Sequence, residues 1–244
     1  MNRPQVIAHR GASAQAPENT LAAFRRALAL GVDGVELDVH LSADGEPVVL
    51  HDSAVDRTTD GTGLVRDMTL AALRRLDAGR WFGEAFAGER IPTLAEALEV
   101  LRGVRVIVEI KNGPIYYPKI ADRVVAVVRA IGHPAVTFSS FDHPALLEVR
   151  RVDPAAETAV LFMGRPVDPV ALAVAAGARR LHAHWMWVTA DVVAAVHRAG
   201  LAVEVWPVDD PVPMAHLAAL GVDGIITSHP DRLQAVLADR RAVR

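Results

Sequence analysis

Short apolar runs alternate along nearly the whole chain with longer segments in which apolar residues recur every three or four positions. The short runs have the length of buried β-strands, and the longer segments have the spacing of amphipathic helices. Eight main strands are predicted, each followed by a helix, at residues 5–8, 35–39, 105–110, 135–139, 158–162, 179–183, 201–206 and 223–227. Such an alternation is typical of an α/β protein, and eight repeats match a (β/α)8 TIM barrel.

Glycines mark the points where predicted helices give way to strands. The sequence LGVDG at 30–34, before the second strand, recurs at 220–224 before the last, and Gly177 and Gly200 hold the equivalent position elsewhere. Glycine there can adopt the left-handed conformation that ends a helix. A doubly wound open sheet is the alternative, but no Gly-x-Gly-x-x-Gly motif follows the first strand, so we expect the barrel.

One connection is too long for an ordinary loop. Residues 52–92 contain only a short predicted helix near 69–76, whereas connections in compact domains have a median of about 4–6 residues. We therefore expect a single barrel domain spanning 1–244, with a small insertion after the second strand at about 52–92. Thr93 and Glu96 have the spacing of a capping box and predict the start of the next helix.

The second predicted strand carries the first candidate chemistry. Apolar and acidic residues alternate in it, so Glu36 and Asp38 share one face. A solvated edge strand could carry two such carboxylates, but a strand that follows a helix in an α/β fold is usually buried. Two adjacent buried carboxylates need a cation or a shared proton at neutral pH. A tight turn predicted at 44–45 then returns the chain to present His51.

Ionisable and polar residues stand at most of the predicted strand ends, where the functional groups of a barrel collect. They are His9, Arg10, Glu36, Asp38, Glu109, Lys111, Ser139, Ser140, His182, His184, Glu204, Trp206, Thr227 and Ser228. Glu36, Asp38 and Glu109 offer three hard oxygen donors, and the chain has no cysteine. This donor set favours one divalent cation, Mg²⁺ or Ca²⁺, over Zn²⁺.

Arg10 and Lys111 add two cations beside the predicted metal site. Phosphate is the anion that combines with a divalent ion and two cationic side chains. His9 and His51 are then placed to move protons, one at the attacking oxygen and one at the leaving group. Each residue alone has an ordinary structural explanation, but their conjunction favours metal-assisted cleavage of a phosphate ester.

The same residues stand in motifs that resemble the glycerophosphodiester phosphodiesterases. The resemblance covers nearly the whole chain and rests on an ordered set of short motifs. They are HRG at 9–11, PENT at 17–20, ELDV at 36–39, DG at 44–45, VVLHD at 48–52, RTT at 57–59, IPTL at 91–94, EIK at 109–111, SSF at 139–141, WPVD at 206–209 and GVDGIIT at 221–227.

This resemblance implies a (β/α)8 barrel that hydrolyses a glycerophosphodiester to sn-glycerol 3-phosphate and an alcohol, with Mg²⁺ or Ca²⁺. It therefore also implies a place in lipid and glycerol metabolism. By position it implies roles for eight residues: His9 and His51 as the acid/base pair, Arg10 and Lys111 as phosphate contacts, Glu36, Asp38 and Glu109 as metal ligands, and Trp206 in the glycerol pocket.

Two alternatives remain open at the level of sequence. A phospholipase D acting on lysolipids or sphingolipids would share the metal and histidines but needs an apolar entrance, for which the candidates are Phe82, Phe86, Trp185, Met186 and Trp187. A non-catalytic phosphodiester-binding protein would be expected to have lost one of the seven polar site groups. None is lost in this chain.

Charge and hydropathy indicate which kinds of binding partner the protein is expected to have. The formal net charge is −3, and no basic stripe is present, which argues against nucleic acid. The N-terminal residues do not form a signal-peptide pattern, and no apolar run approaches the roughly 18 residues of a membrane span. We expect a cytoplasmic protein with a small-molecule substrate, and the sequence leaves its oligomeric state open.

Overall fold

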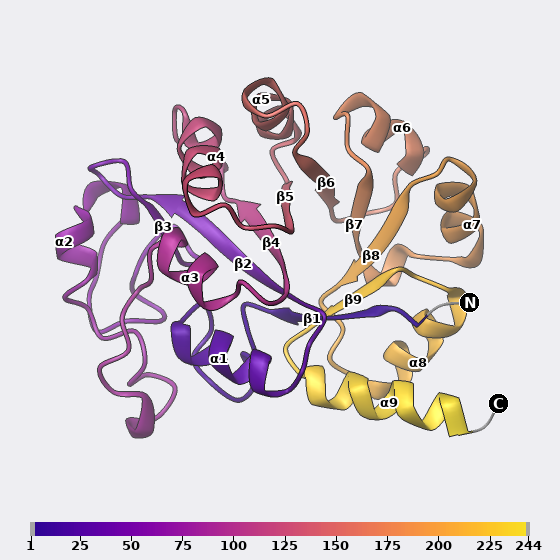
Figure 1. Cartoon of the computed structure of the whole chain (residues 1–244), viewed down its shortest axis with the longest axis horizontal. Helices are drawn as coiled ribbons and strands as arrows, with labels where there is room; N and C mark the ends of the chain where they lie inside the picture. The colour runs from indigo at the N-terminus through magenta and orange to yellow at the C-terminus, as the bar shows by residue number, and fades with distance from the viewer. Residues whose placement is uncertain (1–2, 243–244) are drawn as a thin grey trace.

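Eight parallel strands close into a barrel in the computed structural model, which describes residues 3–242 (Figure 1). The first strand pairs with both the second and the last, so the sheet has no open edge between them. The barrel strands are β1 (Gln5–His9), β2 (Gly34–Leu41), β4 (Arg105–Ile110), β5 (Val136–Ser140), β6 (Glu157–Phe162), β7 (Arg180–His184), β8 (Ala202–Trp206) and β9 (Gly224–Thr227). The predicted (β/α)8 fold is confirmed.

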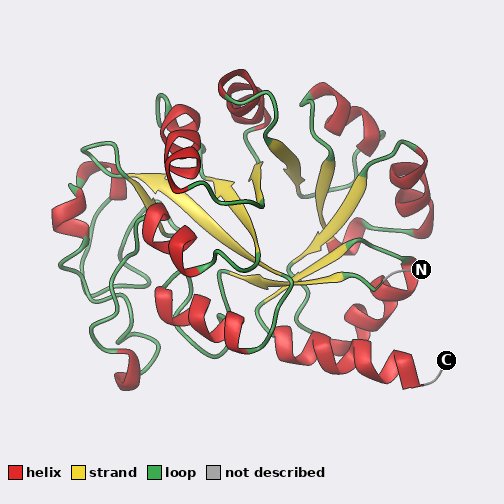
Figure 2. Cartoon of the chain, in the orientation of Figure 1, coloured by secondary structure: helices red, strands yellow, loops and turns green. Residues whose placement is uncertain are grey.

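A ring of helices surrounds the strands (Figure 2). These helices are α1 (Leu21–Ala29), α3 (Leu94–Val100), α4 (Ile120–Ile131), α5 (His143–Val152), α6 (Pro169–Ala175), α7 (Ala190–Arg198), α8 (Pro211–Leu220) and α9 (Pro230–Ala242). Thr93 and Glu96 form the predicted capping box at the start of α3. Gly31 and Gly221 have positive φ angles of 70° and 86°, as expected where a helix turns back toward a strand. Among the described helices, none is both long and apolar enough to cross a membrane.

The segment after β2 first forms a hairpin and then a small separate core. The strand β3 (Pro47–Val49) pairs antiparallel with β2 across the predicted turn, where Gly45 has a φ of 81°. The short elements η1 (Val65–Asp67), α2 (Leu70–Leu73) and η2 (Glu84–Phe86) follow. They enclose a cluster of buried apolar side chains: Val48, Leu50, Val55, Val65, Leu73, Ala78 and Ile91. The predicted insertion after the second strand is therefore present.

The interior of the barrel holds an apolar layer and, on the side of that layer where the strands begin, a group of charged side chains. Ile7, Ile107 and Ile226 form that layer. Glu204 is fully buried, and its carboxylate lies 2.6 Å from Nη1 of Arg105, at the first residue of β4.

This arrangement corrects one prediction from the sequence, which placed His182 and Glu204 among the groups of the functional site. His182 Nε2 lies 2.9 Å from Glu204 Oε2 instead, and Arg180 Nη1 lies 3.0 Å from Oε1 of the same carboxylate. The two residues belong to a buried ion-pair network with arginines from the beginnings of strands.

Candidate active site

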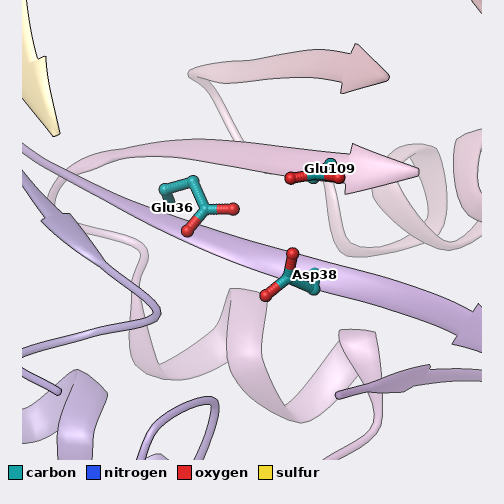
Figure 3. A group of neighbouring side chains, drawn as sticks. All are labelled: Glu36, Asp38 and Glu109. Carbon is teal, nitrogen blue, oxygen red and sulfur yellow. The ribbon is translucent and has the colours of Figure 1, made fainter. Parts of the chain in front are cut away.

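Three carboxylates meet where β2 and β4 run side by side (Figure 3). Glu36 and Asp38 point from the same face of β2, and Glu109 pairs in register with Asp38 across the sheet. One oxygen atom from each carboxylate lies within 4.8 Å of those from the other two, and all three side chains are buried. The predicted metal ligands are thus brought together.

The electrostatics of the three carboxylates fit a bound cation. Burial and the neighbouring carboxylates raise the pKa of Glu36 well above its usual range, and burial raises the pKa of Glu109 to about 7. Burial also opposes ionisation of Asp38, but the charges of Lys111 and Arg10 hold the pKa of Asp38 below its usual range. Several buried carboxylate oxygens are a hard donor set suited to a divalent ion, so these residues could hold one.

Two cationic side chains border the carboxylates. The ammonium of Lys111 lies 2.9 Å from Asp38 Oδ1 and also contacts Glu109 Oε1. Arg10 Nε lies 3.4 Å from Asp38 Oδ2, and Arg10 Nη1 donates a hydrogen bond to Glu18 Oε1 at 2.8 Å. Although Arg10 Nε is buried, it makes no hydrogen bond to any described residue. It is a donor available to an anion.

Asn19 holds Asp38 in place, a contact that sequence reasoning missed. Asn19 Nδ2 donates a hydrogen bond to Asp38 Oδ2 at 2.8 Å, and its Oδ1 accepts one from the backbone N–H of Asp38. Both Asn19 and Arg10 have a φ of 57°. The only sequence signal was the place of Asn19 in the PENT motif, together with the tolerance of asparagine for left-handed conformations.

The two histidines border the carboxylates from different strands. His9 ends β1, where its Nε2 lies 4.0 Å from Glu36 Oε2, and burial lowers the pKa of His9 to about 4. His51 follows β3, and burial lowers the pKa of His51 as well. The negative charge of Asp38 acts in the opposite direction on the pKa of both histidines. The structure therefore places His9 beside Glu36 and places His51 close enough to Asp38 for their charges to interact.

A chain of paired charges extends from His51 to Arg10. His51 Nδ1 lies 2.6 Å from Asp52 Oδ1, and Asp52 accepts two hydrogen bonds from the Arg57 guanidinium at 2.8 and 3.0 Å. Arg57 also donates two hydrogen bonds to Glu18, at 2.9 and 2.8 Å. Glu18 in turn accepts the hydrogen bond from Arg10. Asp52, Arg57 and Glu18 were not predicted as site residues.

Trp206 lies at the end of β8, beside two other rings. Its ring stands edge-on to Phe141, with centroids 5.5 Å apart, and to His184, with centroids 5.4 Å apart. Trp206 Nε1 donates a hydrogen bond to the backbone carbonyl of His182 at 2.9 Å. This bond fixes the indole at the end of the barrel where the three carboxylates lie.

The candidates for an apolar entrance are mostly packed against their neighbours. Phe82 and Phe86 contact each other edge-on, with centroids 5.4 Å apart, and Trp185 packs against the main core. Met186 and Trp187 are 62% and 42% exposed. Phe82, Phe86 and Trp185 are partly buried, so Met186 and Trp187 are the most exposed of the five candidates.

Comparison with known proteins connects this geometry to one family. The sequence model of the glycerophosphoryl diester phosphodiesterase family matches residues 9–232. A glycerophosphodiester phosphodiesterase of Caldanaerobacter subterraneus subsp. tengcongensis is 42% identical over 231 residues, which cover 93% of this chain and 95% of that protein. The structure of an Oleispira antarctica phosphodiesterase in complex with the product sn-glycerol-3-phosphate matches with a TM-score of 0.89 at 34% identity, covering 97% of each chain.

A crystal structure of a putative glycerophosphoryl diester phosphodiesterase from Silicibacter pomeroyi matches equally well, with a TM-score of 0.89 at 30% identity. That match covers 98% of this chain and 94% of the other. The family match spans His9, Arg10, the three carboxylates, His51, Lys111 and Trp206. The chain belongs to the glycerophosphoryl diester phosphodiesterase family.

Proposed function

We propose that this protein hydrolyses glycerophosphodiesters to sn-glycerol 3-phosphate and an alcohol with the help of one divalent cation, Mg²⁺ or Ca²⁺. The observation that carries the proposal is the set of three buried carboxylate oxygens within 4.8 Å of one another, bordered by Lys111 and Arg10. The Oleispira antarctica phosphodiesterase, with sn-glycerol-3-phosphate bound, supports the choice of substrate. A cytoplasmic location and a place in lipid and glycerol metabolism stay predictions from the sequence.

In this proposal Arg10 and Lys111 bind the phosphoryl group. Arg10 Nε has no hydrogen-bond partner among the described residues and can donate to a phosphoryl oxygen. Both cations are fixed by their ion pairs with Asp38 before the substrate arrives, so they can stabilise the charge that grows in the transition state without rearrangement. A divalent ion held by Glu36, Asp38 and Glu109 would polarise a phosphoryl oxygen as a Lewis acid.

His9 and His51 carry the protons. Asp52 accepts a hydrogen bond from His51 Nδ1, which leaves His51 Nε2 to exchange a proton with the substrate or the nucleophile. One histidine acts as the base and the other protonates the leaving alkoxide, and the geometry is compatible with either order. Trp206 lines the pocket for the glycerol moiety.

The nucleophile is either water or the free hydroxyl of the substrate's own glycerol. Attack by the glycerol hydroxyl forms a cyclic phosphate and breaks the P–O bond to the alcohol, which leaves, and water then opens the ring to give sn-glycerol 3-phosphate. Phosphorus NMR of a quenched time course separates the two routes, because a cyclic phosphate that rises and falls indicates the internal hydroxyl. Its absence throughout turnover indicates water.

Replacement of His51 tests the assignment of the proton carriers. We expect His51→Ala to lower kcat by about 10²–10⁴-fold, because a positioned acid or base contributes about that factor. Circular dichroism should show an unchanged fold. His216→Ala, on the exposed surface of α8, is the matched control and should retain the turnover of the natural sequence. Unchanged turnover by purified His51→Ala would contradict the assignment.

A further inference from the structure

A cavity of about 270 Å³ opens directly beside Glu109 and Lys111. Its outer walls come from the loops that follow β4 and β5 and include Tyr116, Phe141 and Asp142. Because Glu109 and Lys111 also border the position proposed for the phosphate, the cavity continues from that position. Trp206, proposed to line the glycerol pocket, does not border this cavity in the described structure. The cavity is therefore available to the second substituent of a phosphodiester, which is the alcohol that leaves.

Asp142 adds to this cavity a carboxylate that is not ion-paired with any cation among the described residues. Its carboxylate accepts a hydrogen bond from the neutral amide of Asn112 at 2.6 Å. Within the described residues, Asp142 forms no ion pair. Of the residues that the structure describes, the other charged groups lining the cavity are Glu109 and Lys111, which contact each other.

Two aromatic rings line the same cavity as this carboxylate and remain accessible. Phe141 is 49% exposed and Tyr116 is 69% exposed, so neither ring is consumed by core packing. The edge-on contact between Phe141 and Trp206 holds the Phe141 ring at the mouth of the barrel. Accessible aromatic faces beside a carboxylate attract alkylammonium groups through cation–π and ionic attraction.

We propose that the cavity bordered by Tyr116, Phe141 and Asp142 is a head-group subsite that selects a cationic amino alcohol as the leaving group. This proposal rests on the proposed function and names the class of glycerophosphodiester that the site prefers. A choline or ethanolamine moiety brings its ammonium to Asp142 and the rings while its ester oxygen stays at the phosphate. A neutral polyol of similar size can occupy the same cavity, but it gains neither the ionic attraction of Asp142 nor the cation–π attraction of the rings.

The test compares cationic and neutral diesters on the full-length chain. Initial rates with glycerophosphocholine, glycerophosphoethanolamine and glycerophosphoglycerol give kcat and KM for the natural sequence and for two variants. Asp142→Asn removes the charge and keeps an oxygen that can accept the hydrogen bond from Asn112. The Asp142 side chain makes no capping hydrogen bond to α5, so the substitution does not remove a helix cap. Phe141→Leu removes the aromatic face. Glu148→Gln, which changes an exposed carboxylate on α5, the helix that follows Asp142, is the matched control.

We expect the natural sequence to prefer the two cationic diesters. Each variant should lower the ratio of kcat/KM for glycerophosphocholine to that for glycerophosphoglycerol by about two- to fivefold, the range of exposed cation–π and ionic contacts. The loss should lie in KM, since a remote head group is bound equally in ground and transition states. Glu148→Gln should leave the ratio unchanged.

Three results would overturn the subsite. They are the absence of a cationic preference in the natural sequence, an unchanged ratio in both variants, or an equal loss on all three diesters. The last result would place the glycerol phosphate moiety in this cavity instead. Failure of the natural sequence to hydrolyse any of the three diesters with Mg²⁺ or Ca²⁺ would be distinct, because it would contradict the proposed function itself.

Discussion

Arg57 connects the His51 side of the site to the Arg10 side through four hydrogen bonds. One edge of its guanidinium binds Asp52, which holds His51, and the other binds Glu18, which holds Arg10. Hydrogen bonds from Arg57 hold the pKa of Asp52 well below its usual range, so Asp52 stays ionised and accepts a hydrogen bond from the Nδ1–H group of His51. A single side chain outside the reaction centre thus positions a proposed proton carrier and a proposed phosphate contact.

Replacement of Arg57 should therefore impair catalysis without removing a reacting group. We expect Arg57→Gln to lower kcat/KM by about 10- to 100-fold, because small displacements of catalytic groups have effects of that size. Arg57→Lys should restore little of it, since an ammonium cannot bind both carboxylates in the fork geometry of a guanidinium. Steady-state kinetics with glycerophosphocholine measures the effect.

Arg80→Gln provides the control for Arg57, because Arg80 is an exposed arginine in the same insertion and lies outside this chain of charges. It should leave the kinetics unchanged. Kinetics of Arg57→Gln equal to those of the natural sequence would show that His51 and Arg10 are held by other contacts.

At the scale of elements, periodicity in the sequence predicts which face a side chain occupies but not its depth in the barrel. Alternation correctly placed Glu36 and Asp38 on one face of β2, and the turn and capping signals located the hairpin and the start of α3. Glu204 was misplaced because depth depends on the stagger between strands. Its register partner is Gly224, which pairs with Gln5 at the beginning of β1.

Contacts that depend on the path of a loop were also beyond the sequence. Asn19 reaches Asp38 because Arg10 and Asn19 both turn the chain through left-handed conformations. Asp52 and Glu18 meet at Arg57 from segments 5 and 39 residues away from it. No local pattern in the sequence encodes such a meeting, although the motifs of the family contain all of these residues.

The loop from β1 to α1 offers a test of how an element positions the site. Gly11 has a φ of 82°, and a Cβ added there would lie 2.7 Å from the backbone carbon of Ala23 in α1. We expect Gly11→Ala to reduce the free energy of unfolding by about 1–3 kcal/mol through backbone strain and crowding. It should also lower kcat/KM, because the displaced loop carries Arg10.

Gly200→Ala is the control that separates the effect of backbone strain from the effect of displacing the loop that carries Arg10. Gly200 has a φ of 71°, but an added Cβ would meet no atom within 4 Å, and the residue lies between α7 and β8. This variant should lose some stability in urea denaturation and keep the kinetics of the natural sequence. If Gly11→Ala also kept those kinetics, the loop would not be what places Arg10.

At the scale of the whole molecule, the barrel interior contains two groups of charged residues: the ion pairs of Glu204, which stabilise the fold, and the three carboxylates of the candidate active site. The carboxylate of Glu204 is paired with Arg105, Arg180 and His182 below the isoleucine layer, and the three site carboxylates lie above it. Although burial opposes its ionisation, hydrogen bonds and charges from these partners hold the pKa of Glu204 well below its usual value of 4.5. Such a group stabilises the folded state only while it is ionised.

Glu204→Gln should therefore destabilise the protein in a pH-dependent manner. We expect the free energy of unfolding to fall by at most about 3–5 kcal/mol at pH 7, because two partly buried arginines lose their common counter-ion. The folded-state pKa of Glu204 lies below its unfolded value, so this contribution is present above pH 4.5 and is lost as the pH falls further. The difference between variant and natural sequence should narrow below that pH.

Urea denaturation at pH 7 and near pH 4 measures this change. Glu157→Gln is the control, because the Glu157 carboxylate pairs with the same Arg180 but is 38% exposed, and its loss should cost at most about 1 kcal/mol. A difference for Glu204→Gln that is the same at both pH values would contradict the assigned charge state.

The dependence of glycerophosphodiester hydrolysis on a divalent cation tests the central claim most directly. The purified chain is treated with EDTA, assayed with glycerophosphocholine for release of sn-glycerol 3-phosphate, and then assayed again after Mg²⁺ or Ca²⁺ is returned. The account predicts that turnover is lost with EDTA and restored by at least one of the two ions. Full turnover in the presence of EDTA, or no release of sn-glycerol 3-phosphate with either ion, would contradict it.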